Sequence, residues 1–140
     1  MAVGPLAKVK YYPIAGFQLG TTEASIKTPG RKDLVVMQAQ AGSSMAGVFT
    51  ANAFCAAPVH LCRRHLQDDS PLALVINTGN ANAGTGEAGD ADALTSCDEL
   101  AKALNLTSSQ VLPFSTGVIG EKLPIEKIVT NLPRAISKLD

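Results

Sequence analysis

Two short segments hold the residues of this chain that could do chemistry. Residues 77–86 read NTGNANAGTG, with three Asn, three Gly and two Thr but no charged residue, and they follow the apolar run at 72–76. Residues 115–117 read STG and follow the apolar run at 111–114. Glycine permits positive φ and close backbone approach, and asparagine tolerates left-handed conformations. Small-residue loops after strands are typical of ligand-contacting sites, although either segment could be an ordinary turn.

The chemistry that suits these segments is the stabilisation of an anion. Backbone N–H groups and small hydroxyls at strand ends can bind the oxyanion that forms during acyl transfer. The spacing excludes other motifs, because Gly79-x-x-x-x-Gly84 lacks the lysine of a phosphate-binding P-loop. Residues 84–86 (GTG) do not have the spacing of a dinucleotide fingerprint, and no serine stands in a GxSxG elbow.

The cysteines and histidines do not suggest a catalytic or metal centre. Cys55, Cys62 and Cys97 form no CxxC pair, so we interpret them as small packing residues. His60 and His65 have no cysteine or carboxylate at convincing metal-ligand spacing, and we expect both on the surface of a helix. We therefore expect no metal and no cofactor.

The composition limits the class of protein. With 140 residues, the chain is predicted to form a single domain over residues 1–140. Twelve basic residues balance twelve acidic ones and only 4% of residues are aromatic, which argues against a nucleic-acid partner. No apolar run approaches the roughly 20 residues of a membrane span. The first residues lack the apolar stretch of a secretory signal, and an odd number of cysteines favours reduced thiols, so we expect a cytoplasmic location.

The elements that must position the two segments alternate along the chain. The strands at 34–39 and 46–50 are expected to form a hairpin, and Pro133 is expected to kink or divide the last helix. This order predicts an α/β fold with helices flanking at least part of the sheet. We expect strands at residues 17–19, 25–27, 34–39, 46–50, 72–77 and 111–114, and helices at 58–66, 87–105 and from Pro124 onward.

Several motifs resemble the ornithine acetyltransferases, which are the bifunctional ArgJ family of glutamate N-acetyltransferases. Residues 46–50 (AGVFT) and 56–59 (AAPV) are similar to an early part of that family. Residues 77–86 resemble its Asn/Gly loop, and residues 115–124 (STGVIGEKLP) resemble its STGxIGxxLP motif. The likeness covers nearly the whole chain. It implies a layered sheet-and-helix α/β fold of the DmpA/ArgJ type that is completed by a separate β chain.

The resemblance also implies a self-cleaving acyltransferase of arginine biosynthesis. In this family a precursor cuts itself before a threonine and yields an α and a β chain, which are expected to form an α2β2 heterotetramer. The threonine then takes the acetyl group from N-acetylornithine and passes it to glutamate, and some members also accept acetyl-CoA. The oxyanion-hole pair of the family corresponds to Thr116 and Gly117. A self-cleaving aminopeptidase or amidase of the same fold and a non-enzymatic module that binds a small anion are the alternatives.

The chain departs from the family pattern in its extent. The α chain of the family continues through a substrate-binding segment to the Lys-Gly that precedes the nucleophile, and neither is found in these 140 residues. We therefore expect most of an α chain, without its end and without the β chain. We also expect this polypeptide to be inactive and poorly soluble alone, because the apolar helix face at 125–139 would be uncovered.

Overall fold

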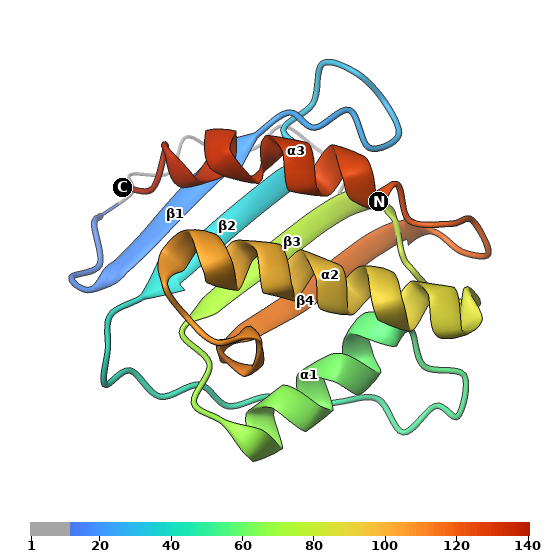
Figure 1. Ribbon diagram of the computed structural model, residues 1–140, viewed down its shortest axis with the longest axis horizontal. Coiled ribbons are helices and arrows are strands. Elements are labelled where there is room, and N and C mark those ends of the chain that lie inside the picture. Colours follow the sequence, from blue (N-terminus) through green and yellow to red (C-terminus); the bar gives the residue numbers. More distant parts are fainter. Residues whose placement is uncertain (1–11) are drawn as a thin grey trace.

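A four-stranded mixed sheet organises residues 12–140, the part of the chain that the computed structural model describes. The strand order is β1-β2-β3-β4, in which β1–β2 and β2–β3 are antiparallel and β3–β4 are parallel. The α/β prediction is confirmed (Figure 1). The strands are β1 (Phe17–Thr22), β2 (Leu34–Ala39), β3 (Ala73–Asn80) and β4 (Val111–Val118), and the helices are α1 (Ala57–Asp68), α2 (Gly86–Leu104), the short 3₁₀ helix η1 (Ser108–Gln110) and α3 (Ile125–Ile136).

Helices cover one face of this sheet. In Figure 1, α3 lies across β1 and β2, α2 lies over β3 and β4, and α1 runs beside β4. Alternate strand residues point to opposite faces, and the buried members of this alternation, such as Val36 and Val75, pack with Leu100 and Ile128 of the helices. Because α2 is the crossover between two parallel strands, the carboxyl ends of β3 and β4 meet at one edge of the sheet.

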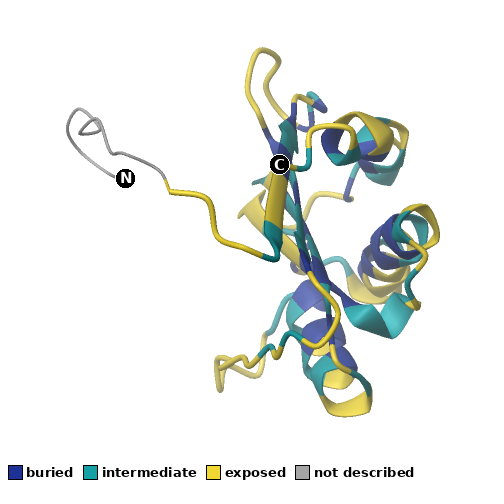
Figure 2. Ribbon diagram, turned by 90° about the vertical axis from the view of Figure 1, so that its left-hand side faces the viewer, coloured by how far each residue is buried: buried dark blue, intermediate teal, exposed yellow. Residues whose placement is uncertain are grey.

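The other face of the sheet has no helix on it, as the edge-on view in Figure 2 shows. Its side chains are apolar and only partly buried: Leu19 is 40% and Phe114 is 43% exposed. The strand register places these residues in adjacent rows across the four strands. We call this surface the open sheet face, and define it by Leu19, Val35, Met37, Leu74, Ile76 and Phe114.

Two of the expected strands are wrong. Residues 25–27 form a turn, because the Asp33 carboxylate accepts hydrogen bonds of 2.6 Å from the backbone N–H groups of Ala24 and Ile26, and Ser25 has a φ of 52°. Residues 46–50 have no regular structure, so the expected hairpin is also wrong. The physical reason is that β1 and β3 already occupy both edges of β2.

The last helix also differs from its prediction. The expected division at Pro133 is wrong, because α3 continues as a single helix to Ile136. Pro133 stands inside α3 near its end and removes one backbone N–H from the helix, which nevertheless continues past it. Ile128, Leu132 and Ala135 are buried. The apolar face of α3 is therefore covered by β1 and β2, contrary to the expectation from the sequence.

The remaining elements agree with prediction to within a few residues. Helix α1 begins at Ala57 with Pro58 in its first turn, and α2 ends at Asn105 in a left-handed cap. Within α2, Ala93 and Ser96 take the inward positions, and Leu94 is 37% exposed. No helix within residues 12–140 has the length and apolar character needed to cross a membrane.

Candidate oxyanion site at the ends of β3 and β4

The parallel register of β3 and β4 brings the two candidate segments side by side. Asn77 lies opposite Ser115, Thr78 opposite Thr116, and Gly79 opposite Gly117. The interpretation of residues 115–117 as a loop is wrong, since β4 continues through them to Val118. The extension has a simple cause: β3 itself runs to Asn80 and offers pairing partners for these residues.

Thr116 is an exposed residue at this edge of the sheet. Within residues 12–140 its hydroxyl makes no hydrogen bond, so the O–H is available as a donor. Thr116 lines one end of a groove of about 490 Å³ together with Phe114, Ile76 and Pro58. The site therefore combines a free hydroxyl with a largely apolar surface beside it.

Gly117 occupies a position that only glycine can fill. Its φ is 135°, and a Cβ atom built on it would lie 2.4 Å from the carbonyl carbon of Gly79 and 2.6 Å from the backbone nitrogen of Asn80. The ladder shifts register between Gly79 and Asn80, so that Asn80 pairs with both Thr116 and Val118. Irregularities of this kind re-aim the backbone next to active sites. The backbone of Gly117 is thus held tightly against the end of β3.

Asn77 joins β3 to β4 two residues before Gly79 and Gly117. Its side chain is buried, with 3% exposure. The Ser115 hydroxyl donates a hydrogen bond of 2.6 Å to Asn77 Oδ1, and Asn77 Nδ2 donates one of 2.9 Å to the carbonyl oxygen of Asn80. Both ends of this amide are therefore satisfied inside the protein.

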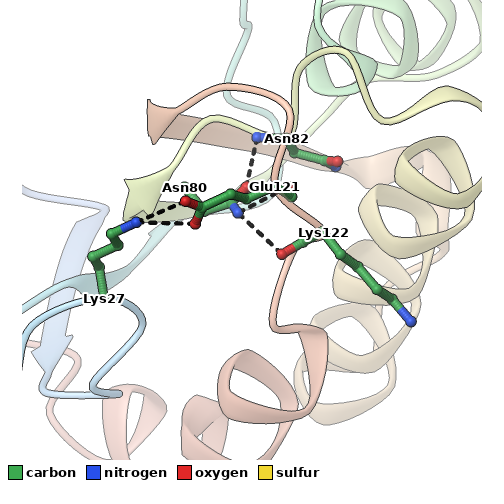
Figure 3. Close-up of polar contacts among 5 residues, drawn as sticks. All are labelled: Lys27, Asn80, Asn82, Glu121 and Lys122. Atoms are coloured by element: carbon green, nitrogen blue, oxygen red, sulfur yellow. Dashed lines mark hydrogen bonds and ion pairs between the residues drawn. The ribbon is translucent and has the colours of Figure 1, made fainter.

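Asn80 ties the strand end to the segment that follows β4. Its Nδ2 donates hydrogen bonds of 3.1 Å to the carbonyl oxygens of Glu121 and Lys122, and its Oδ1 accepts one of 2.8 Å from the backbone N–H of Asn82 (Figure 3). The Glu121 carboxylate also pairs with Lys27 at 2.9 Å, which attaches the turn after β1 to the same segment.

Asn82 shapes the turn into α2. It is fully buried with a φ of 47°, a conformation that asparagine tolerates. Its Nδ2 donates to the carbonyl oxygen of Gly89 at 2.8 Å, and its Oδ1 accepts from the Thr85 hydroxyl at 2.9 Å. The three asparagines of residues 77–86 therefore bind protein groups, and the exposed groups of the site are on Thr116, Gly117 and Thr78.

Thr78 is a residue that the sequence analysis did not single out. It is exposed and lies directly opposite Thr116 in the parallel register. The sequence does contain a hint of its position, because the apolar runs of β3 and β4 are both followed by small polar residues. If the two strands are parallel neighbours, the polar residues that follow them lie side by side. The sequence pattern alone does not say which strands are neighbours.

Among the cysteines and histidines, only Cys62 lines the groove that contains Thr116. Cys62 and Cys97 are buried, which confirms the packing interpretation for these two, whereas Cys55 is half-buried. Burial raises the pKa of Cys62 to about 11 and also raises that of Cys97. His60 is exposed, but the surface placement of His65 is wrong. His65 is buried between α1 and β4 with its Nδ1 2.7 Å from the carbonyl oxygen of Val111, because α1 presents that face to the sheet.

The sheet, its covering helices and the paired strand ends define an α/β protein with small, exposed polar groups at the carboxyl ends of two parallel strands. The family model of the ArgJ family matches residues 18–140, and the chain belongs to this family. It is 52% identical over 139 residues to the arginine biosynthesis bifunctional proteins ArgJ of Pseudomonas fluorescens and Pseudomonas syringae pv. tomato. Each alignment covers 99% of this chain and 34% of the relative, so the chain spans about a third of the length of these relatives.

Solved structures share the fold. Ornithine acetyltransferase from Mycobacterium tuberculosis, solved in complex with ornithine, is similar with a TM-score of 0.86 and 33% identity over 90% of this chain and 68% of that one. The arginine biosynthesis bifunctional protein ArgJ of Bacillus halodurans is similar with a TM-score of 0.80 and 33% identity over 84% of this chain and 62% of that one. The described residues therefore have the ArgJ fold.

Proposed function

We propose that this chain is the α-chain portion of a self-cleaving glutamate N-acetyltransferase of arginine biosynthesis. The observation that carries the proposal is the exposed Thr116 hydroxyl next to the Gly117 backbone at the end of β4, where β4 runs parallel to the end of β3. The similarity to ArgJ proteins and to an ornithine acetyltransferase supports the same reaction class.

In the proposed reaction, a threonine hydroxyl of the β chain attacks the acetyl carbonyl of N-acetylornithine. The new C–O bond produces a tetrahedral oxyanion, which the Thr116 hydroxyl and the backbone at Gly117 stabilise by hydrogen bonding. Collapse of this intermediate breaks the C–N bond, and ornithine leaves after its amine takes up the proton that the attacking threonine hydroxyl has lost. The amine of glutamate then attacks the acetyl-threonine through a second oxyanion, which releases N-acetylglutamate and restores the threonine.

The open sheet face supports the proposed β-chain partner. Leu19, Met37, Leu74 and Phe114 form a continuous apolar surface, and surfaces of this kind mark contacts with other chains. The surface is continuous with Thr116, since Phe114 and Thr116 point to the same side of β4. A β chain that covered this face would place its nucleophile beside the proposed oxyanion site, and two such pairs would form the α2β2 heterotetramer.

Two finer points also belong to the proposal. Use of acetyl-CoA as a second acetyl donor is proposed from the bifunctional naming of the relatives, as is a cytoplasmic location from their biosynthetic role. A self-cleaving aminopeptidase of the same fold would share the oxyanion site, and we prefer the acetyltransferase because the named relatives are ArgJ proteins.

The deciding experiment uses the complete precursor that contains this chain. Purified protein is incubated with N-acetylornithine and glutamate, and N-acetylglutamate and ornithine are quantified by mass spectrometry; acetyl-CoA replaces N-acetylornithine in a parallel assay. We expect stoichiometric formation of both products and a second chain that begins with threonine. Hydrolysis of peptide amides without acetyl transfer would favour the aminopeptidase instead.

A further inference from the structure

We propose that the hydrogen bond between Ser115 and Asn77 positions the oxyanion donors, so that Ser115 and Asn77 are positioning residues for acetyl transfer. This inference rests on the proposed function and adds to it two residues whose side chains are hydrogen-bonded to each other. Their hydrogen bond is short, at 2.6 Å, and joins β4 to β3 directly before the donor pair.

The alternation of side chains explains why this bond controls Thr116. Asn77 is buried and points to the helix-covered face, as do Val75 and Ala73 at alternate positions of β3. Its partner Ser115 points the same way, so Thr116 points to the open sheet face. Fixing the Ser115 side chain on one face therefore fixes the direction of the Thr116 side chain on the other.

The same amide also supports the backbone against which Gly117 packs. Asn77 Nδ2 donates to the carbonyl oxygen of Asn80, the residue at which the ladder shifts register. A Cβ on Gly117 would meet the backbone of Gly79 and Asn80. The position of this end of β3 therefore determines where the Gly117 backbone lies. One buried side chain thus connects the residue before the hydroxyl donor with the bulge that holds the backbone donor.

Burial makes this connection effective. Asn77 is buried and Ser115 is half-buried, so few solvent partners compete for this hydrogen bond, and loss of one member leaves the other unsatisfied. Ser115→Ala would leave Asn77 Oδ1 without its donor while changing little volume. The expected result is a strand end whose direction is less well defined, and a displacement of about 1 Å at a reacting group can lower the rate by about 10²-fold.

The test compares variants of the complete precursor. We expect Ser115→Ala to lower kcat of acetyl transfer roughly 10- to 100-fold with a smaller change in KM. Ser115→Thr keeps the hydroxyl and should recover most of the activity. Ser96→Ala is the matched control, because it removes a buried hydroxyl that donates to the Ala93 carbonyl oxygen within α2, away from the site.

A double-mutant cycle separates positioning from general loss of stability. If Ser115 acts through Thr116, adding Ser115→Ala to Thr116→Ala should lower kcat by less than about threefold, because the donor that it positions is already absent. If Thr116→Ala alone is slow but Ser115→Ala alone turns over like the control Ser96→Ala, this inference is overturned and the proposed function remains intact. If Thr116→Ala turns over like the parent, the oxyanion assignment fails and this inference fails with it.

Discussion

At the scale of single residues, the Thr116 hydroxyl is the group most directly tied to the proposed chemistry. Thr116→Ala in the complete precursor should lower kcat by about 10²–10³, the usual cost of losing one oxyanion donor. KM should change less, because the hydroxyl is needed mainly in the transition state. Thr116→Ser should retain more activity, and self-cleavage should slow in the alanine variant because it passes through a similar oxyanion. Steady-state kinetics and the rate of appearance of the β chain measure both effects; normal maturation and turnover within about twofold of the parent would contradict the assignment.

The thiols are expected to be dispensable for the reaction. Burial raises the pKa of Cys62 to about 11 and also raises that of Cys97, so both are protonated and weakly nucleophilic at neutral pH. Replacing Cys55, Cys62 and Cys97 by Ala or Ser should leave turnover within a few-fold of the parent, apart from packing losses. The check is the time course of iodoacetamide treatment. Inactivation that tracks the alkylation of one cysteine in a folded protein would disprove this prediction.

At the scale of elements, the paired ends of β3 and β4 depend on Gly117. Gly117→Ala should destabilise the protein by about 2–5 kcal/mol, because it adds a clash with the backbone of β3 to the strain of a positive φ. Gly42→Ala is the control: Gly42 has a φ of 86°, but nothing lies within 4 Å of the added Cβ, so only the conformational strain remains. Urea unfolding of both variants measures the difference, and equal midpoints would contradict the tight packing of the strand ends.

A second element-scale link joins the end of α1 to η1 and responds to pH. The Ser109 hydroxyl, followed by the Ser70 backbone N–H and the Thr107 hydroxyl, donates hydrogen bonds to Asp69 and lowers the pKa of its carboxyl group. A carboxyl whose pKa is lowered by folding stabilises the protein above its ordinary titration range, and this contribution disappears as the pH falls through the folded-state pKa.

The corresponding prediction concerns the pH dependence of stability. Asp69→Asn should destabilise the protein at pH 7, and its difference from the parent should shrink as the pH falls below about 4, the ordinary range of aspartate. Urea unfolding at several pH values measures this difference. A gap that is unchanged, or that widens in acid, would show that the hydrogen bonds to the charged carboxylate contribute nothing.

At the scale of the whole molecule, the decisive feature is a sheet with only one face covered by helices. The helix face of α3 is covered by β1 and β2, so the expected poor solubility of the isolated polypeptide has a different cause, which is the open sheet face. We expect this polypeptide alone to be inactive, to associate, and to increase the fluorescence of an apolar dye. Leu19→Lys should reduce dye binding and association, because it places a charge in that surface. A monodisperse monomer with acetyl-transfer activity would refute this prediction.

The sequence by itself determined the local elements and the family. Apolar runs of five and four residues predict the cores of β3 and β4. Pro58 marks the start of α1, and residues 77–86 and 115–124 identify the family without any structure. The place of residues 115–117 after an apolar run singled out that segment, and the resemblance to the family implied the roles of Thr116 and Gly117 within it. These features are short-range, and they are encoded by neighbouring residues.

Only the tertiary structure decided which strands pair, in which register they pair, and which side chains of each helix are buried. Both edges of β2 are occupied by β1 and β3, which left residues 46–50 without a strand partner, and the packing of α1 on β4 buried His65. The parallel register set Thr78 beside Thr116 and extended β4 through the STG segment. Pairing, register and the choice of buried face depend on residues far apart in the chain, so no window of sequence contains them. The asparagines show the division most clearly: their spacing indicated a special loop, but only the folded contacts revealed that they hold the site together while Thr116 faces outward.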